Sequence, residues 1–314
     1  MKIDVLDNIS EELFTSEYIE KNKPVVIKNL KFEKDKWHPD HLKDLIGHLP
    51  TQEYDSLFDL KNLSTLSQYI DEYFGKSGDY KPNIPYVRWY NRLKDVDYAW
   101  GDEAFAKLRS LWKKPDFFSG KNLLIPPSQQ DQYPDPVIDP FPYRGILVAA
   151  RGARTRLHTD PFCSDAMVVQ FYGSKDVAMY HPSRVKELSI NHSDDSFGGY
   201  LDVRKERLDT LSVTPDFEGR LNPGELLYVP HGWLHDVIAV EDSVSITWNF
   251  IHERGALEYI DYLMDDPKND SEFEVLNYFY QQAGENFAAP ADIIKRYNQY
   301  FYQIEQALEE QVHV

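Results

Sequence analysis

The stretch from Thr155 to Asp160 (TRLHTD) holds two strong metal-ligand types two residues apart. Residues i and i+2 of a β-strand point to the same face, so the imidazole of His158 and the carboxylate of Asp160 would present donor atoms to one point. A third ligand is offered downstream by His235, in the segment PHGWLH. Two histidines and one carboxylate that leave coordination positions open form the facial triad of non-haem Fe(II) oxygenases. We therefore predict that His158, Asp160 and His235 bind Fe(II).

Each of these residues also has an ordinary structural explanation. An HxD triplet occurs by chance in many proteins, His158 could be a satisfied core histidine, and Asp160 could cap the turn that Pro161 begins. His231 lies four residues before His235 but between Pro and Gly, a context typical of a turn. We therefore interpret His231 as a loop histidine near the rim of the cleft.

Length and charge bound the class of protein. The chain has 314 residues, with 42% hydrophobic and 14% aromatic residues, which is typical of a globular protein. Its net charge of −18 argues against nucleic acid as a major partner and weakly favours a basic peptide target. The single cysteine, Cys163, excludes an intramolecular disulfide and a Cys-rich zinc site. With no secretory signal and no apolar stretch long enough to span a membrane, we predict a cytoplasmic location.

The residues before the motif indicate a supporting scaffold, which we assign to residues 1–140. Ser10 is a plausible N-cap for a first helix. We expect helices at 10–22, 38–49, 63–74 and 101–117, strands at 23–28 and 84–90, and an irregular segment at 118–142. Tyr86, Arg88 and Tyr90 share one face of the second strand. We expect Arg88, Trp89 and Tyr90 to line the substrate side.

From residue 143 the pattern changes to short, closely spaced strands, which is typical of a sandwich or barrel. We predict a catalytic core at residues 141–254 and a polar insertion at 186–210. The strands are expected at 146–150, 155–160, 167–172, 176–181, 225–229, 236–240 and 244–250. Residues 255–314 read as helices at 257–264, 271–282 and 290–311, which pack onto the barrel or, alternatively, form a homodimer interface.

Several blocks, taken together in their order and spacing, resemble the Jumonji-C family of 2-oxoglutarate oxygenases. These blocks are residues 142–148, 152–161, 173–182, 222–235 and 246–250. The similarity covers about residues 86–250 and is closer to the hydroxylase-type branch than to the large histone demethylases. It implies a mainly β fold, a double-stranded β-helix (jelly-roll or cupin barrel) with an N-terminal α/β scaffold and C-terminal helices.

The resemblance also assigns a cosubstrate site. It implies that Lys175 pairs with the distal carboxylate of 2-oxoglutarate, that Thr155 and Tyr86 hydrogen-bond it, and that Asn249 lines its pocket. A buried dicarboxylate needs a paired cation, because an unpaired buried charge is very costly. Val168 stands where the nearest relatives have an asparagine, so we expect the hydrogen bonding of the cosubstrate to differ in detail.

The activity implied is oxidative decarboxylation of 2-oxoglutarate with Fe(II) and O₂, coupled to hydroxylation of a C–H bond. We expect the substrate to be an amino-acid side chain of a peptide or protein. N-methyl demethylation and a small-molecule substrate remain open, and the family also holds a hydroxylase of a modified tRNA base, which the acidic charge disfavours here. The alternatives of another class are a metal-binding cupin without catalysis and a zinc hydrolase or isomerase. The Lys175 site argues against the non-catalytic cupin.

Overall fold

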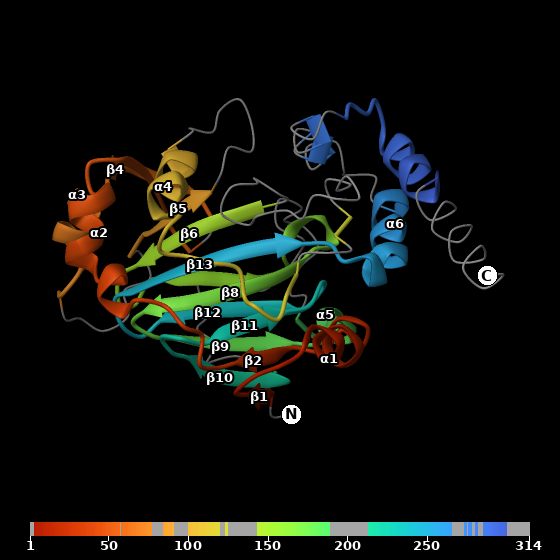
Figure 1. The fold of residues 1–314 in the computed structure, drawn as a ribbon, viewed down its shortest axis with the longest axis horizontal. Coiled ribbons are helices and arrows are strands. Elements are labelled where there is room, and N and C mark those ends of the chain that lie inside the picture. The colour runs from red at the N-terminus through yellow and green to blue at the C-terminus, as the bar shows by residue number, and fades with distance from the viewer. Residues whose placement is uncertain are drawn as a thin grey trace.

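Two β-sheets form the centre of the molecule (Figure 1). The computed structural model describes residues 3–56, 58–76, 84–90, 100–119, 123–124, 143–188, 213–265, 273–274, 276–277, 280–281 and 285–299. The larger sheet has nine strands in the order β1-β2-β11-β8-β13-β6-β5-β3-β4, and the smaller has four in the order β10-β9-β12-β7. A hydrogen bond from Lys175 on β9 to Ser245 on β13 joins the two sheets through the interior.

Eight strands that follow one another in the chain build the barrel. Most consecutive strands belong to different sheets, which is the connectivity of a jelly roll. The predicted mainly β jelly-roll fold is thereby confirmed. The strands are β6 (Tyr143–Ala149), β7 (Arg154–His158), β8 (Asp165–Tyr172), β9 (Lys175–Tyr180), β10 (Phe217–Leu221), β11 (Leu226–Val229), β12 (Leu234–Ala239) and β13 (Ser243–Phe250).

The alternation of side chains along β8 explains why this sheet has two apolar faces. Met167, Val169 and Phe171 belong to a large cluster that includes residues of the helices. Ala166 and Val168 instead belong to a second cluster with residues of β9 and β11, inside the barrel. Successive residues of a strand point to opposite faces, so one strand serves both clusters.

The N-terminal residues extend the larger sheet at both edges. β1 (Asp4–Leu6) and β2 (Val25–Ile27) join it beside β11, whereas β5 (Tyr86–Tyr90), β3 (Pro50–Tyr54) and β4 (Leu60–Thr65) join it beside β6. Helices lie on the outer side of this sheet, where their apolar residues enter the large cluster (Figure 1). They include η2 (Lys34–Trp37), α2 (Pro39–Ile46), α3 (Leu66–Tyr73) and α4 (Trp100–Leu108).

The four helices predicted before the barrel exist, but each ends earlier than expected; the one expected at 38–49, for example, ends at Ile46. The first begins after Ser10, whose Oγ accepts from the Leu13 amide at 3.2 Å, and continues as α1 (Glu11–Phe14) and the π-helix η1 (Thr15–Ile19). The predicted helix at 63–74 was wrong for its first residues, which belong to β4. Thr65 and Gln68 form a capping box, and this places the helix start at Leu66. The helix predicted at 101–117 ends at Leu108.

All seven predicted strands of the barrel are present, and an eighth, β10, was missed. Its sequence FEGRL is polar at the exposed positions and contains a glycine, because β10 is an edge strand of the smaller sheet. The strand predicted at 155–160 was too long. β7 ends at His158, and Asp160 is an extended residue just before a 3-10 turn, η3 (Pro161–Cys163).

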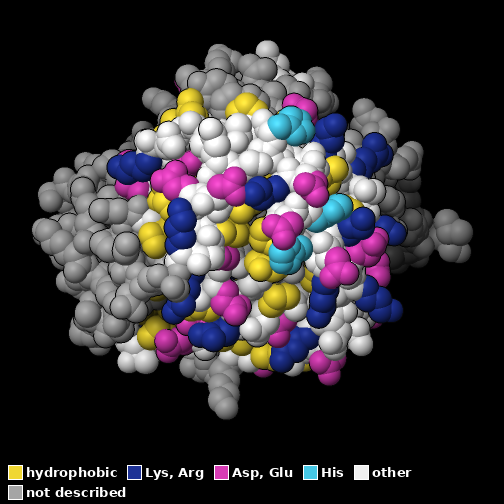
Figure 2. Space-filling view, turned by 90° about the vertical axis from the view of Figure 1, so that its left-hand side faces the viewer, with side chains coloured by type: hydrophobic (Ala, Val, Ile, Leu, Met, Phe, Trp, Pro, Cys, Tyr) yellow, Lys and Arg dark blue, Asp and Glu magenta, His cyan; other side chains and the backbone are white. Residues whose placement is uncertain are grey.

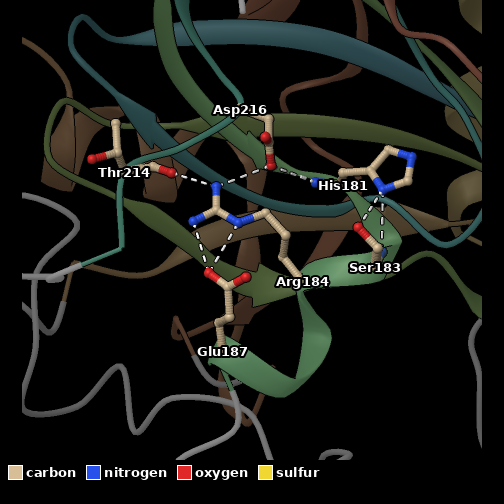
Figure 3. Close-up of polar contacts among 6 residues, drawn as sticks. All are labelled: His181, Ser183, Arg184, Glu187, Thr214 and Asp216. Carbon is tan, nitrogen blue, oxygen red and sulfur yellow. Dashed lines mark hydrogen bonds and ion pairs between the residues drawn. The ribbon is translucent and has the colours of Figure 1, made fainter.

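Arg184 fastens the turn after β9 to the segment that leads into β10 (Figure 3). Arg184 lies in η4 (Pro182–Arg184), which continues into α5 (Val185–Leu188). Its guanidinium donates to the Thr214 carbonyl at 2.6 Å and to the carboxylates of Asp216 at 3.1 Å and Glu187 at 3.0 Å. Asp216 also accepts from the His181 amide at 2.9 Å. The predicted insertion at 186–210 falls almost wholly outside the described residues.

The chain becomes helical again after the barrel, as predicted. η7 (Glu253–Gly255) leads into α6 (Ala256–Asp265), which includes the helix expected at 257–264. Parts of the two later predicted helices, including residues 300–314, lie outside the described residues. Within the described part of the chain, no helix combines the length and apolar character that crossing a membrane requires. The division at residues 140 and 254 stays a prediction.

Candidate metal centre

His158, Asp160 and His235 come together at one end of the barrel interior. One ligand atom of each lies within 4.8 Å of the other two. His158 and His235 are direct partners in the antiparallel pair of β7 and β12, and their ring centroids are 4.1 Å apart. The Nε2 atom of His235 lies 3.9 Å from Oδ2 of Asp160. The three predicted metal ligands therefore converge, with each imidazole carried by a strand.

Backbone carbonyls fix how both imidazole rings point. Nδ1 of His158 lies 2.6 Å from the Arg156 carbonyl, and Nδ1 of His235 lies 3.0 Å from the Trp233 carbonyl. A carbonyl only accepts, so each Nδ1 carries the proton and each Nε2 keeps its lone pair. A hydrogen bond from the ring nitrogen that does not bind the metal to a backbone carbonyl is typical of metal-ligating histidines.

Asp160 offers a carboxylate oxygen that no donor in the described residues satisfies. Its Oδ2 is buried and has no hydrogen-bond partner. Asp160 occupies the N-cap position of η3, but its side chain makes no capping bond, so the helix-cap explanation does not account for it. Buried polar atoms are nearly always paired, so this oxygen is suited to a metal.

The electrostatics of the site keep His158 suited to binding a cation. Burial, and then the neighbouring His235 ring, hold the pKa of His158 well below its ordinary value. Burial raises the pKa of Asp160, while His235 and a hydrogen bond from Asn249 act in the other direction. Two neutral imidazoles and one carboxylate fit a divalent transition metal such as Fe(II).

Lys175 lies in the same interior, at the start of β9. Its Nζ donates to Oγ of Ser245 at 2.7 Å, and its side chain is buried. Burial lowers the pKa of Lys175 from 10.5 to about 7. Within the described residues, no carboxylate pairs with it. A buried ammonium in this position is costly unless an anion pairs with it. Sequence reasoning missed Ser245, because a serine on a strand carries no local signal of its contacts.

The other predicted cosubstrate residues surround this interior from different strands. Thr155 pairs with Val237 on β12, and Lys175 pairs with Ala239 two residues further along the same strand. Tyr86 is buried in a small cluster that also contains Ala239. Thr155 and Lys175 thus flank β12 from β7 and β9, and Tyr86 approaches from β5 of the larger sheet. Their joint role in binding the cosubstrate stays a prediction.

Three further predictions concern single residues around the site. Asn249 is buried on β13 and donates to Ser164 at 3.2 Å, while its amide also bonds the Asp160 carboxyl. It therefore contacts a predicted metal ligand. Val168 packs into the inner apolar cluster, and its effect on cosubstrate hydrogen bonding stays a prediction. Trp89, expected on the substrate side, is buried and donates to the Pro50 carbonyl at 3.0 Å.

His231 is tied to a buried carboxylate and is absent from the metal cluster. Its backbone amide donates to Oδ1 of Asp165 at 2.8 Å, and its Nδ1 lies 3.0 Å from the same atom. Burial acts to lower the pKa of His231, but the hydrogen bond to Asp165 and the negative charges of Asp165 and Glu258 together outweigh it, so the net shift is upward. The pair fixes the turn that leads into His235, four residues later.

The tip of the β3–β4 hairpin reaches the metal site. The Ser56 carbonyl accepts from the Arg156 amide of β7 at 3.3 Å. The ring of Phe58 lies edge-on to the His158 ring, with centroids 5.2 Å apart. The guanidinium carbons of Arg88 and Arg156 lie 4.7 Å and 5.1 Å from the centroid of the Phe58 ring. Sequence reasoning expected Arg88 on the substrate side but missed Phe58 and Arg156, because a hairpin tip has no periodic pattern that predicts its contacts.

A model of the cupin-like domain family matches residues 10–256. Among named proteins, the chain is 26% identical over 263 residues to the lysine-specific demethylase JMJ21 of Arabidopsis thaliana, covering 78% of this chain and 25% of that protein. It is 23% identical over 265 residues to the arginine-specific demethylase JMJ22 of Arabidopsis thaliana, covering 81% of this chain and 47% of that protein.

A third relative is named for an activity. The 2-oxoglutarate and iron-dependent oxygenase JMJD4 of Danio rerio is 27% identical over 150 residues, covering 46% of this chain and 33% of that protein. The chain thus spans about a quarter to a half of the length of these three relatives.

Proposed function

The chain belongs to the cupin-like domain family, and on that premise we propose that it is an Fe(II)- and 2-oxoglutarate-dependent oxygenase. The observation that carries the proposal is the convergence of His158, Asp160 and His235 beside a buried lysine. A cupin that only binds a metal needs the three ligands but has no need of the buried lysine. A buried cation with no counter-charge among the described residues calls for an anionic cosubstrate.

The residues of the chain divide the work of binding. The Nε2 atoms of His158 and His235 and the carboxylate of Asp160 hold the metal on one side and leave its other positions open. Lys175, with Ser245 behind it, pairs with the distal carboxylate of 2-oxoglutarate. Thr155 and Tyr86 donate hydroxyl hydrogen bonds to the same end, which adds affinity without adding charge.

Bound Fe(II) supplies the redox chemistry that couples decarboxylation of 2-oxoglutarate by O₂ to insertion of one oxygen atom into a C–H bond. The balance is one 2-oxoglutarate, one O₂ and one C–H group consumed, with succinate, CO₂ and one C–OH group formed. The apolar side chains inside the barrel, such as Val177 and Met179, keep bulk water from the reacting groups.

The substrate we propose is an amino-acid side chain of a peptide or protein. Relatives named as lysine-specific and arginine-specific demethylases support a protein substrate. Hydroxylation at carbon leaves a stable alcohol, whereas hydroxylation of an N-methyl group ends in loss of formaldehyde. Mass spectrometry separates these outcomes as a gain of one oxygen atom or the loss of one methyl group. A homodimer through the C-terminal helices and a cytoplasmic location remain predictions.

Succinate formation tests the proposal. The wild type should convert 2-oxoglutarate to succinate with Fe(II), O₂ and ascorbate, and His158→Ala should reduce this to the level of free iron. Lys175→Ala should raise the KM for 2-oxoglutarate. Lys21 is an exposed lysine between η1 and β2, and Lys21→Ala should leave this KM unchanged. Succinate formation that survives His158→Ala, or an activity that needs zinc and no O₂, would rule out the proposed oxygenase function.

A further inference from the structure

One face of β13 carries three polar side chains in a row. Ser245, Thr247 and Asn249 are two residues apart from one another, so they point to the same face of the strand. The residues between them belong to the large apolar cluster on the other face of the sheet. The hydroxyl of Ser245 accepts from the ammonium of Lys175 on the smaller sheet, at 2.7 Å. The row therefore faces the interior of the barrel.

This row links the two ends of the proposed cosubstrate site. Ser245 marks the lysine end. Asn249 marks the metal end, since it donates to Oγ of Ser164, four residues after Asp160 in the chain, at 3.2 Å. Thr247 lies between them. A strand rises about 3.4 Å per residue, so Thr247 is about 7 Å from each neighbour in the row.

Thr247 is the member of the row whose hydroxyl has no hydrogen-bond partner within the described residues. Its side chain is only 6% exposed. Buried hydroxyls are nearly always paired, so an unpaired one calls for an explanation. Its oxygen is not fully enclosed, whereas the unpaired hydroxyl oxygen of Tyr228 is. A group that enters the barrel can therefore reach the hydroxyl of Thr247.

The strands on both sides of β13 add no polar side chain at this level. Thr247 pairs with Val168 on β8 and with Gly145 on β6. Neither a valine nor a glycine side chain can form a hydrogen bond. A polar group of a ligand that rests on this part of the sheet is therefore met by the hydroxyl of Thr247.

This inner face differs from the surface at the end of the barrel where β13 begins. That surface mixes acidic, basic and histidine side chains (Figure 2). Lys34, His38 and Asp242 line a surface pocket there. Inside the barrel, the row from Ser245 to Asn249 carries no charge. Its hydroxyl and amide groups can bind an anion beside Lys175 without adding a second buried charge.

We propose that the hydroxyl of Thr247 donates a hydrogen bond to the carboxylate at the metal-binding end of 2-oxoglutarate. The inference rests on the proposed function. With bonds of about 1.2–1.5 Å, an extended five-carbon diacid is about 6 Å long. This length is close to the distance of about 7 Å from Ser245 to Thr247. With one carboxylate held at Lys175, the other therefore lies at the level of Thr247.

Packing alone is the competing explanation for Thr247. Threonine is common in strands, and its methyl group could simply fill space beside Val168. Valine has nearly the same shape as threonine and lacks only the hydroxyl. Packing alone therefore predicts that Thr247→Val binds the cosubstrate as well as the wild type does, whereas a hydrogen bond predicts a loss.

The experiment measures cosubstrate binding without turnover. The full chain is loaded with Fe(II) in the absence of O₂, and a 2-oxo acid is titrated in while its visible charge-transfer absorption with iron is recorded. The ligands are 2-oxoglutarate and 2-oxopentanoate, which has a methyl group in place of the distal carboxylate. The Kd of each ligand is compared among the variants, and the Kd for Fe(II) alone is measured separately.

Thr247→Val should raise the Kd for 2-oxoglutarate about tenfold, which is the effect of losing one hydrogen bond to a charged group. The Kd for 2-oxopentanoate should rise by the same factor, because this ligand keeps the carboxylate at the metal end. Thr247→Ser keeps a hydroxyl and should restore most of the affinity. The Kd for Fe(II) alone should not change, since the proposed bond is to the cosubstrate.

Thr51→Val is the matched control. Thr51 is buried on β3 of the same sheet, and its hydroxyl lies 3.5 Å from the Gln52 carbonyl. The substitution removes the same hydroxyl from a strand outside the barrel and should leave the Kd of both ligands unchanged. Melting temperatures establish that every variant is folded.

Several results would overturn the proposal. They are an unchanged Kd for 2-oxoglutarate in Thr247→Val, a Thr247→Ser variant as weak as Thr247→Val, or an equal loss in Thr51→Val. A loss for 2-oxoglutarate without one for 2-oxopentanoate would place the bond at the distal carboxylate and contradict the assignment. A wild type that binds neither ligand would remove the proposed function itself, which is distinguishable from a wild type that binds both with no effect of Thr247→Val.

Discussion

Replacing Lys175 by Met should weaken 2-oxoglutarate binding and also stabilise the folded protein below pH 7. Burial lowers the pKa of Lys175 from 10.5 to about 7. Below pH 7 the lysine is charged in both states, and the folded state carries the full cost of the buried charge. At 1.36 kcal/mol per pKa unit this cost is about 5 kcal/mol. Loss of the bond to Ser245 offsets about 1 kcal/mol of the gain from its removal.

The sign of the pH dependence follows from the same shift. Between pH 7 and 10.5 the unfolded state binds more protons than the folded state, so this lysine makes stability rise with pH across that window. The stabilisation by Lys175→Met should therefore be about 4 kcal/mol at pH 6 and vanish by about pH 10.5. Urea unfolding at pH 6, 8 and 10 measures it, with Lys21→Met as the exposed control.

Cosubstrate binding should move the same proton. The carboxylate of 2-oxoglutarate favours the charged lysine, so binding should take up about half a proton at pH 7 and close to one at pH 8. Calorimetry in buffers of different ionisation enthalpy counts these protons. The affinity of Lys175→Met should fall at least about a hundredfold, because an unpaired carboxylate remains buried.

Two results would refute this reasoning. One is a Lys175→Met variant that binds 2-oxoglutarate like the wild type, which would mean that another residue pairs with the carboxylate. The other is a variant less stable than the wild type at pH 6, which would mean that the buried ammonium is already compensated. Proton uptake of zero at pH 8 would contradict the lowered pKa directly.

Three further perturbations test how the fold supports the site. Gly173→Ala should destabilise the protein by more than about 2 kcal/mol, since its φ is +61° and a Cβ would clash with the backbone; Gly75→Ala, with φ +69° and open space, should cost about 1 kcal/mol in the same urea assay. Arg154→Met should lower the free energy of unfolding by about 3–5 kcal/mol, because it leaves the carboxylate of Asp236 buried and unpaired. The double variant Arg154→Met with Asp236→Leu should recover most of this loss; a double variant as unstable as the single one would argue against the cost of an unpaired buried charge. His231→Gln should lose stability at pH 5.5 and little at pH 9, because a raised folded pKa contributes stability only below it; a pH-independent loss would rule out the ion pair with β8.

Residue type and spacing were sufficient to predict the metal ligands, because the ligands lie on or next to single strands. His158 and Asp160 are two residues apart, and His235 follows a strongly apolar run, so both parts of the metal site could be found from type and spacing. Lys175 needed the resemblance as well, because a lysine after a turn is ordinarily exposed. The pairing of His158 with His235 across β7 and β12 then needed the fold.

The contacts that pattern could not predict are those made between elements distant in the chain. Phe58 reaches His158 because the β3–β4 hairpin folds back over β7, and nothing in the residues around Phe58 encodes that path. β10 was missed for a different reason, since an edge strand has one solvated face and little apolar periodicity.

The central claim is that His158, Asp160 and His235 hold Fe(II) with 2-oxoglutarate beside them, and anaerobic titration tests it most directly. A ferrous ion chelated by a 2-oxo acid absorbs visible light by charge transfer, with no need for O₂ or substrate. The wild type should develop this band with one Fe(II) and one 2-oxoglutarate per chain, and His235→Ala should not. A wild type without the band, or a His235→Ala variant that keeps it, would contradict the account.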